Sequence, residues 1–163
     1  MASGDVLARW AAADGVPPTA TFAYTIRRNK DLVAVFDAGT DWFLNFFDML
    51  RGYNGGGVTL RIAWTSDTAT TNNVVWAAAF EARADDAQDL DADSFAAVQS
   101  VTAAAPSVAG EVVYDEIAFT NGAQMDSIAV GESFCLQISR DADNASDTMA
   151  GNAHLVALEL RET

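Results

Sequence analysis

Hydrophobic and polar residues alternate along most of the chain, from about residue 21 to the end. In residues 58–65, Val, Leu, Ile and Trp alternate with Thr, Arg, Ala and Thr. Residues 134–139 repeat the pattern, with Phe134, Leu136 and Ile138 on one side. Alternation with a period of two is typical of β-strands that bury one face and expose the other. The same reasoning places Val156, Leu158 and Leu160 on one face of the final strand.

Turn-forming clusters separate these segments, among them NGGG at 54–57, SDTATTNN at 66–73 and NG at 121–122. We expect eight or nine strands, and one short helical turn at 93–97. Strands at this spacing, without long helices, predict an all-β, single-domain antiparallel β-sandwich. The long polar connection 83–94 favours the jelly-roll type. The candidate strands are 21–26, 32–36, 42–47, 58–65, 74–80, 98–104, 113–119, 134–139 and 154–161.

The N-terminal segment does not follow the alternating pattern. Residues 6–13 have a helical composition, and Gly15 and Pro17-Pro18 would end such a helix. We therefore expect a short N-terminal arm at residues 1–18, followed by the jelly-roll domain at 19–163. Two interpretations of Trp10 are open: it folds back onto the sandwich, or it docks on a neighbouring subunit.

Charge and composition narrow the classes of partner. The chain has 163 residues, half of them hydrophobic, and carries 23 acidic and 9 basic residues for a net charge of −14. Nucleic acids and anionic membrane surfaces both require clustered positive charge, so neither is an expected partner. A single cysteine excludes an internal disulfide. The sequence shows no secretory signal and no apolar run long enough to span a membrane, which predicts synthesis in a reducing cytoplasm.

Residues suited to catalysis are scarce. His154 is the only histidine and begins the final strand, where a structural role is expected. Cys135 alternates with core residues, so it is predicted to face outward or into a subunit contact. No serine lies in a GxSxG motif, and no phosphate-binding or HExxH motif occurs. We predict that the protein is not an enzyme and has no catalytic residue.

The stretch RDADNASDTMAG, residues 140–151, raises the question of calcium. Asp141, Asp143 and Asp147 stand at relative positions 1, 3 and 7, a spacing at which oxygen ligands can surround a calcium ion. The EF-hand template fails, because Ser146 replaces the required glycine and Asn152 replaces the final glutamate. Asx side chains also stabilise turns on their own. We expect a solvated turn and no cofactor, with calcium as the alternative.

Aromatic residues are concentrated at 42–53, where both faces of the predicted strand carry them. A strand that is apolar on both faces lies centrally in a sandwich or is covered by another chain. The pattern therefore indicates core together with a subunit interface rather than an exposed sugar-binding platform.

Three stretches carry a resemblance to a family of proteins encoded in tailed-phage and prophage structural gene regions. They are GGGVTLRIAWTSDTATTNNVVWAAAFE (55–81), DLDADSFAAVQSVTA (89–103) and the segment from FTNGAQ to the C-terminus (119–163). The resemblance implies a jelly-roll virion component, often a homotrimer, in the capsid or in a tail appendage. It supplies no catalytic motif.

The resemblance and the composition together lead to two hypotheses. The first is a capsid decoration (cement) protein on the outer capsid surface of the virion, which binds the lattice of the major capsid protein through many modest contacts. The alternative is a tail-fibre or receptor-binding module that recognises host surface glycans through loops such as 66–73. The expected partner contacts in the first case are Leu7, Trp10, Val16, Trp42, Phe43, Phe46 and Phe47.

Overall fold

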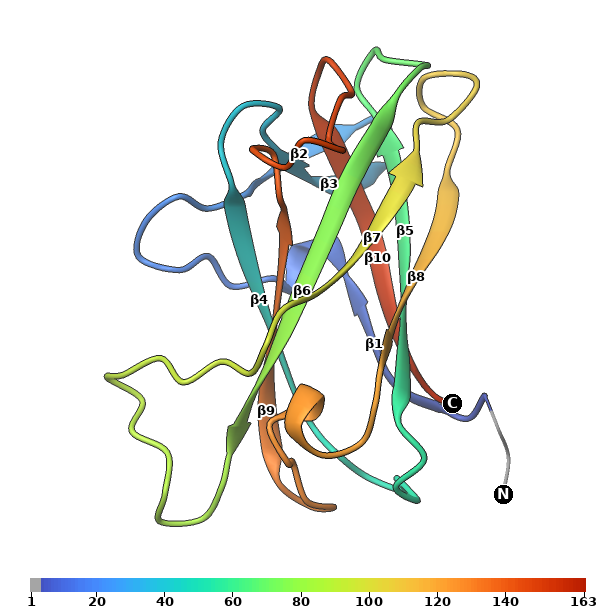
Figure 1. The fold of residues 1–163 in the computed structure, drawn as a ribbon. Helices are drawn as coiled ribbons and strands as arrows, with labels where there is room; N and C mark the ends of the chain where they lie inside the picture. The colour runs from blue at the N-terminus through green and yellow to red at the C-terminus, as the bar shows by residue number, and fades with distance from the viewer. Residues whose placement is uncertain (1–3) are drawn as a thin grey trace.

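A computed structural model describes residues 4–163 as two antiparallel β-sheets packed face to face (Figure 1). The described residues form ten strands, one more than the upper expectation. Two short 3-10 turns, η1 (Ala12–Asp14) and η2 (Ala123–Met125), complete the regular structure. The strands are β1 (Val6–Ala11), β2 (Tyr24–Arg28), β3 (Asp31–Phe36), β4 (Trp42–Met49), β5 (Val58–Ser66), β6 (Asn73–Arg83), β7 (Gln99–Ala104), β8 (Val113–Phe119), β9 (Ser133–Arg140) and β10 (Ala153–Glu162).

The six-stranded sheet has the order β2-β3-β10-β5-β8, with β1 as its sixth strand paired to β10 beside β3. The four-stranded sheet has the order β4-β9-β6-β7. In the larger sheet, β10 pairs with β5 along one edge. Along its other edge, β10 pairs with β3 through residues 153–155 and with β1 through residues 157–161. The last strand of the chain is therefore the central strand of this sheet.

Within residues 4–163, no helix is long and apolar enough to cross a membrane.

The core lies between the two sheets and follows the predicted alternation. Leu60, Ile62 and Trp64 of β5 point inward and are fully buried. They meet Trp76 and Phe80 of β6 from the opposite sheet, with 5.8 Å between the ring centroids of Trp64 and Trp76. Edge-to-face contacts of this kind stabilise a core beyond the burial of area alone. The expected all-β antiparallel sandwich is confirmed.

A β-bulge interrupts the regular alternation in β10. Leu155 pairs with Trp64 of β5 and Ala157 pairs with the adjacent Ala63, so one extra residue is inserted at Val156. Because Val156 and Ala157 together take the place of one residue, every later side chain of β10 faces the side opposite to the one that strict alternation from Leu155 would give. Leu158 then points into the core and is 2% exposed, whereas Val156 is only half-buried. The prediction that Val156 shares one face with Leu158 and Leu160 is therefore wrong: the two leucines face the core and Val156 does not.

The N-terminal segment is part of the sandwich. Residues 6–11, expected to be helical, form β1, and Trp10 is 6% exposed. The Trp10 indole Nε1 donates a hydrogen bond of 3.1 Å to the carbonyl of Phe47. Helical propensity is overridden here because pairing with β10 satisfies the backbone and buries Ala8 and Trp10 on one face. The described part of the expected arm therefore belongs to the domain, and of the two interpretations of Trp10 the structure agrees with the first, in which it folds back onto the sandwich. Residues 1–3 lie outside the described residues.

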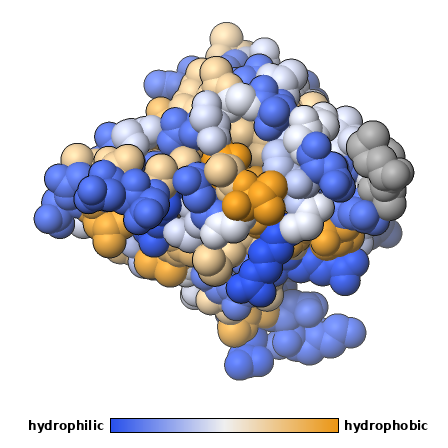
Figure 2. All heavy atoms as spheres, turned by 90° about the horizontal axis from the view of Figure 1, so that it is seen from below, coloured by the Kyte–Doolittle hydropathy of each residue, from blue (hydrophilic) through white to orange (hydrophobic). Residues whose placement is uncertain are grey.

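The long connection between β6 and β7 projects from one end of the sandwich (Figure 1). The helical turn expected at 93–97 does not form, because the backbone N–H of Ala96 donates to the carbonyl of Phe80 and holds this segment extended. Glu81 anchors the connection by accepting hydrogen bonds from Gln88 and from the backbone of Ser94. Figure 2 views this end of the molecule, which is mainly hydrophilic with small, separate hydrophobic patches.

A buried ion pair fixes the loop between β9 and β10. Arg140 and Asp147 have side chains that are 0% and 1% exposed, and they are joined by two hydrogen bonds of 2.7 and 2.9 Å. Arg140 also donates to the carbonyls of Met149 and Gly151. Asp147 accepts a further bond from the backbone N–H of Val75. Arg140 and Asp147 therefore form hydrogen bonds with each other, with backbone carbonyls of the loop and with a backbone N–H of β6.

Replacing Asp147 with alanine should destabilise the fold strongly, because it leaves a buried guanidinium without its counter-ion. We expect the free energy of unfolding to fall by about 3–5 kcal/mol. Urea denaturation measures this change, and Asp143→Ala, at an exposed position of the same loop, is the matched control. Equal unfolding midpoints for the two variants would show that the ion pair contributes nothing to stability.

Candidate functional site

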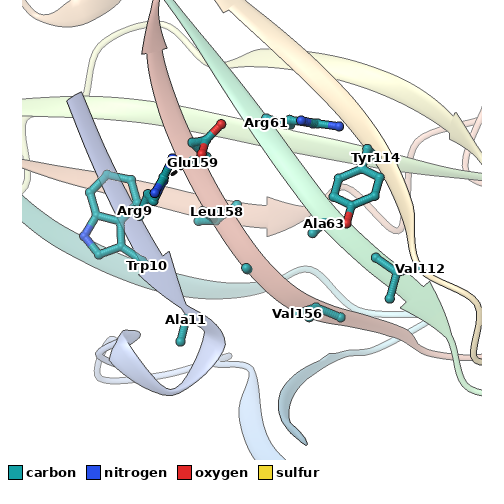
Figure 3. Close-up of a pocket in the computed structure, with 11 residues that line it drawn as sticks. Arg9, Trp10, Ala11, Arg61, Ala63, Val112, Tyr114, Val156, Leu158 and Glu159 are labelled. Atoms are coloured by element: carbon teal, nitrogen blue, oxygen red, sulfur yellow. Dashed lines mark hydrogen bonds and ion pairs between the residues drawn. The ribbon is translucent and has the colours of Figure 1, made fainter. Parts of the chain in front are cut away.

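A groove of about 450 Å³ lies on the outer face of the six-stranded sheet, over β1, β10, β5 and the start of β8 (Figure 3). Its volume falls within the range of typical ligand pockets. Figure 3 shows Arg9 beside Glu159 on one side and Arg61 with Tyr114 on the other, with Ala63 next to Tyr114 and Val156 and Val112 below it. The lining residues are Arg9, Trp10, Ala11, Arg61, Ala63, Val112, Tyr114, Val156, Ala157, Leu158 and Glu159.

One wall of the groove is an aromatic ring held against an arginine. Tyr114 points outward from β8 and is 58% exposed. The guanidinium carbon of Arg61, on the adjacent β5, lies 4.3 Å from the centre of the Tyr114 ring. A cation at this distance is attracted by the face of the ring and restricts its motion. The wall therefore presents an ordered apolar surface with a positive charge at its edge.

The opposite wall is a small ion-pair network. Arg9 of β1 donates to the Glu159 carboxylate of β10 at 2.8 Å, and Arg161 donates to the same carboxylate. Burial alone would raise the pKa of Glu159, but the hydrogen bonds and charges of Arg161 and Arg9 outweigh it and hold the pKa below its usual value. Glu159 is therefore a stable anion that orients two guanidinium groups.

The floor of the groove consists of small and apolar residues. Ala63, Ala157 and Ala11 lie on adjacent strands, and Val156 joins them because of the bulge in β10. Large side chains at these positions would fill the space between the two walls. The groove therefore exists because small side chains face outward at neighbouring positions of β1, β10 and β5.

Two of the seven expected partner-contact residues, Trp10 and Phe46, are buried inside the molecule. Phe46 is fully buried and its ring centroid lies 5.8 Å from that of Trp10. Both residues belong to the core, so their assignment to an external interface is wrong. Leu7 and Trp42 are partly buried and pack against the same core, with Trp42 also 5.6 Å from the ring of Tyr24.

The remaining three expected contacts, like Leu7 and Trp42, keep an exposed part. Val16 is 48% exposed and pairs with Asn45 at the edge of β4. Phe43 and Phe47 are half-buried, and Arg83 lies over the Phe47 ring at 4.4 Å. Their role as partner contacts stays a prediction. The loop 66–73, expected to contact glycans, carries no aromatic residue and does not line the groove.

The acidic loop at 140–151 brings together a different set of carboxylates from the one predicted. Asp41, Asp141 and Asp143 have oxygens within 4.8 Å of one another, whereas Asp147 is engaged with Arg140. Hydrogen bonding with Asp141 and the charge of Asp41 raise the pKa of Asp143. Asn144 donates to Asp141 and accepts from the backbone of Ser146, so the loop is an Asx-rich turn as predicted. The absence of a bound ion stays a prediction.

The two remaining candidates for reactivity are buried. Cys135 faces away from the core between Phe47 and Glu81, and it is 3% exposed. Burial, reinforced by the charge of Glu81, raises the pKa of the Cys135 thiol to about 12, which makes it unreactive. His154 is also buried, and Nη1 of Arg28 lies 3.0 Å from its Nδ1. Because Arg28 can only donate, Nδ1 must accept and the ring must be neutral.

The groove residues were not identified from the sequence. Arg61 and Ala63 were recognised as the outward face of their strand, but the pairing partners of that strand were unknown. Tyr114 and Glu159 approach Arg61 only because β8 and β10 flank β5 in this register. The sequence offered one signal of the groove: Tyr114, a large aromatic residue at an outward-facing position of the strand 113–119.

Comparison with known proteins gives a likeness of fold. No family model matches the chain, and no curated protein matches it. Among solved structures, the chain is similar to a carbohydrate-binding module (CBM6cm-2) of Cellvibrio mixtus lichenase 5A in complex with cellotriose, with a TM-score of 0.51, 15% identity and coverage of 98% of this chain and 99% of that one. It is also similar to the CBM22-1 xylan-binding domain of Paenibacillus barcinonensis Xyn10C, with a TM-score of 0.51, 11% identity and coverage of 98% and 95%. At these identities the likeness concerns the fold, a jelly-roll β-sandwich.

His154 should make stability depend on pH. Burial and the nearby charge of Arg28 lower the pKa of His154 from its ordinary value of 6.5, although Asp67 opposes them. The unfolded chain then binds the proton more readily, so stability should fall as the pH drops below about 6.5. Urea unfolding between about pH 7.5 and pH 5.5 tests this, with His154→Asn as the non-titrating variant that keeps an acceptor. The same pH slope in both proteins would contradict the assignment.

Proposed function

We propose that this chain is a glycan-recognising jelly-roll module that binds sugar in the groove on the outer face of the six-stranded sheet. One observation carries the proposal. On one side of the groove the exposed Tyr114 ring is held by Arg61, and on the other side stand the charged, planar groups of Arg9 and Glu159, with an apolar floor between the two. A sugar presents C–H groups on the faces of its ring and hydroxyl groups at its edge. The tyrosine ring suits the C–H face, and Arg9 and Glu159 suit the hydroxyls.

The proposed role is binding without cleavage. Hydrolysis of a glycoside generally requires two carboxyl groups, one of them protonated near neutral pH. Glu159 is the only carboxylate among the described groove residues, and two arginines keep it ionised. The groove therefore has a hydrogen-bond acceptor where a glycosidase would need a general acid.

The resemblance to phage structural proteins suggests where such a module would act. A receptor-binding module on a tail appendage would recognise glycans on the host surface. Capsid decoration, the first hypothesis, stays a prediction, and it loses two of its expected contacts because Trp10 and Phe46 lie in the core. A groove built for a small ligand favours the receptor-binding role over attachment to a capsid lattice.

Tyr114→Ala should abolish most of the glycan affinity. Removing a central aromatic contact is expected to weaken binding by about ten-fold or more. Titration calorimetry with a glycan selected from an array of host surface oligosaccharides measures the change. Tyr24→Ala is the matched control, because Tyr24 is another exposed tyrosine of the same sheet and lies outside the groove. Loss of binding in the Tyr24 variant alone would place the site elsewhere.

A further inference from the structure

Arg61 differs from the arginines around it in having no acceptor. Arg9 and Arg161 donate to Glu159, and Arg28 donates to the carbonyls of Ser66 and Asp67. Within residues 4–163, no carboxylate oxygen lies within 4.0 Å of the Arg61 guanidinium and no hydrogen bond engages its N–H groups. Its guanidinium carbon instead lies 4.3 Å from the centre of the Tyr114 ring. The N–H donors at the edge of the guanidinium are therefore free to bind a ligand.

The surroundings of Arg61 explain why this charge remains available. Glu116 on β8 and Glu159 on β10 are its register partners on either side. Glu159 is already engaged by Arg9 and Arg161, and Glu116 forms no ion pair with Arg61 among the described contacts. The ring of Tyr114 holds the guanidinium over the groove instead. Arg61 is thus oriented by stacking, which leaves its hydrogen-bonding edge unused.

The local charge of the groove opposes the charge of the protein. The chain as a whole carries −14, with only 9 basic residues. Among the residues that line the groove, Arg9 and Arg61 carry two positive charges and Glu159 one negative charge, a sum of +1. Outside the lining, Glu116 pairs in register with Arg61, and its charge is offset by that of Arg161, which donates to Glu159. At physiological salt, charges beyond about 8 Å are largely screened, so a ligand in the groove experiences mainly this local excess. An anionic group is therefore favoured in the groove although the molecule is acidic.

We propose that the groove selects a glycan that carries a carboxylate, with Arg61 as the carboxylate-binding residue; this rests on the proposed glycan-binding function. The planar fork of a guanidinium matches a carboxylate with two parallel hydrogen bonds. The Tyr114 ring beside it supplies the stacking surface for the sugar that bears the carboxylate. Acidic sugars of the uronic or sialic type combine these two features.

The experiment compares acidic oligosaccharides with their neutral counterparts. The probes are oligogalacturonate with its carboxyl-reduced form, and sialyllactose with lactose, titrated by calorimetry. We expect one acidic probe to bind about ten-fold or more tightly than its neutral partner, because hydrogen bonds between charged groups are stronger than those to hydroxyls. Arg61→Gln should remove this difference, and Arg61→Lys should restore only part of it because lysine lacks the planar fork.

Arg27→Gln is the matched control, because Arg27 is exposed on β2 of the same sheet and lies outside the groove. It should keep the preference for the acidic probe, and thermal unfolding should show that all three variants are folded. Equal binding of acidic and neutral probes, dependent on Tyr114, would overturn the carboxylate assignment and leave glycan recognition intact. Preference for a sulfated oligosaccharide over the carboxylated probes would also overturn it. Failure of every probe and of every array glycan to bind would overturn both proposals.

Discussion

The β-bulge at Val156 in β10 is the constraint on which both faces of the larger sheet depend. If β10 alternated strictly from Leu155 onward with no bulge, Glu159 would point into the core and Leu158 and Leu160 toward solvent. The bulge reverses this order, so the leucines meet the core and Glu159 meets Arg9 and Arg161 outside. The same insertion leaves Val156 and Ala157 on the groove floor. One local irregularity in the central strand thus sets the core register and shapes the candidate site.

Much of the fold could be predicted from alternation alone. The pattern in residues 58–65 and 134–139 identified β5 and β9, because each strand buries one face and exposes the other. The pattern failed at β1, where helix-favouring residues form a strand that pairs with β10. It failed again at Val156, since a bulge leaves no clear mark in a run of apolar residues. Both failures arise from tertiary pairing, which local periodicity does not encode.

The candidate site was much less predictable than the fold. Arg61, Tyr114 and Glu159 are far apart in the sequence, and only the order β10-β5-β8 brings them together. Aromatic residues drew attention to β4 instead, where Phe46 proved to be core. In the acidic loop, where calcium was only the alternative to a solvated turn, Asp147 instead pairs with the buried Arg140. The sequence shows which charged and aromatic residues the chain contains, but only the register of the strands determines which of them lie together in the groove.

In the proposed function, glycan binds on the outer face of the six-stranded sheet, over β5 and β10. Chemical-shift mapping by ¹⁵N–¹H NMR, with a bound oligosaccharide titrated into the labelled protein, locates the site directly. The account predicts that the largest amide shifts cluster at residues 61–63, 112–114 and 156–159. Shifts concentrated in the loop 66–73 or along β4 would contradict it.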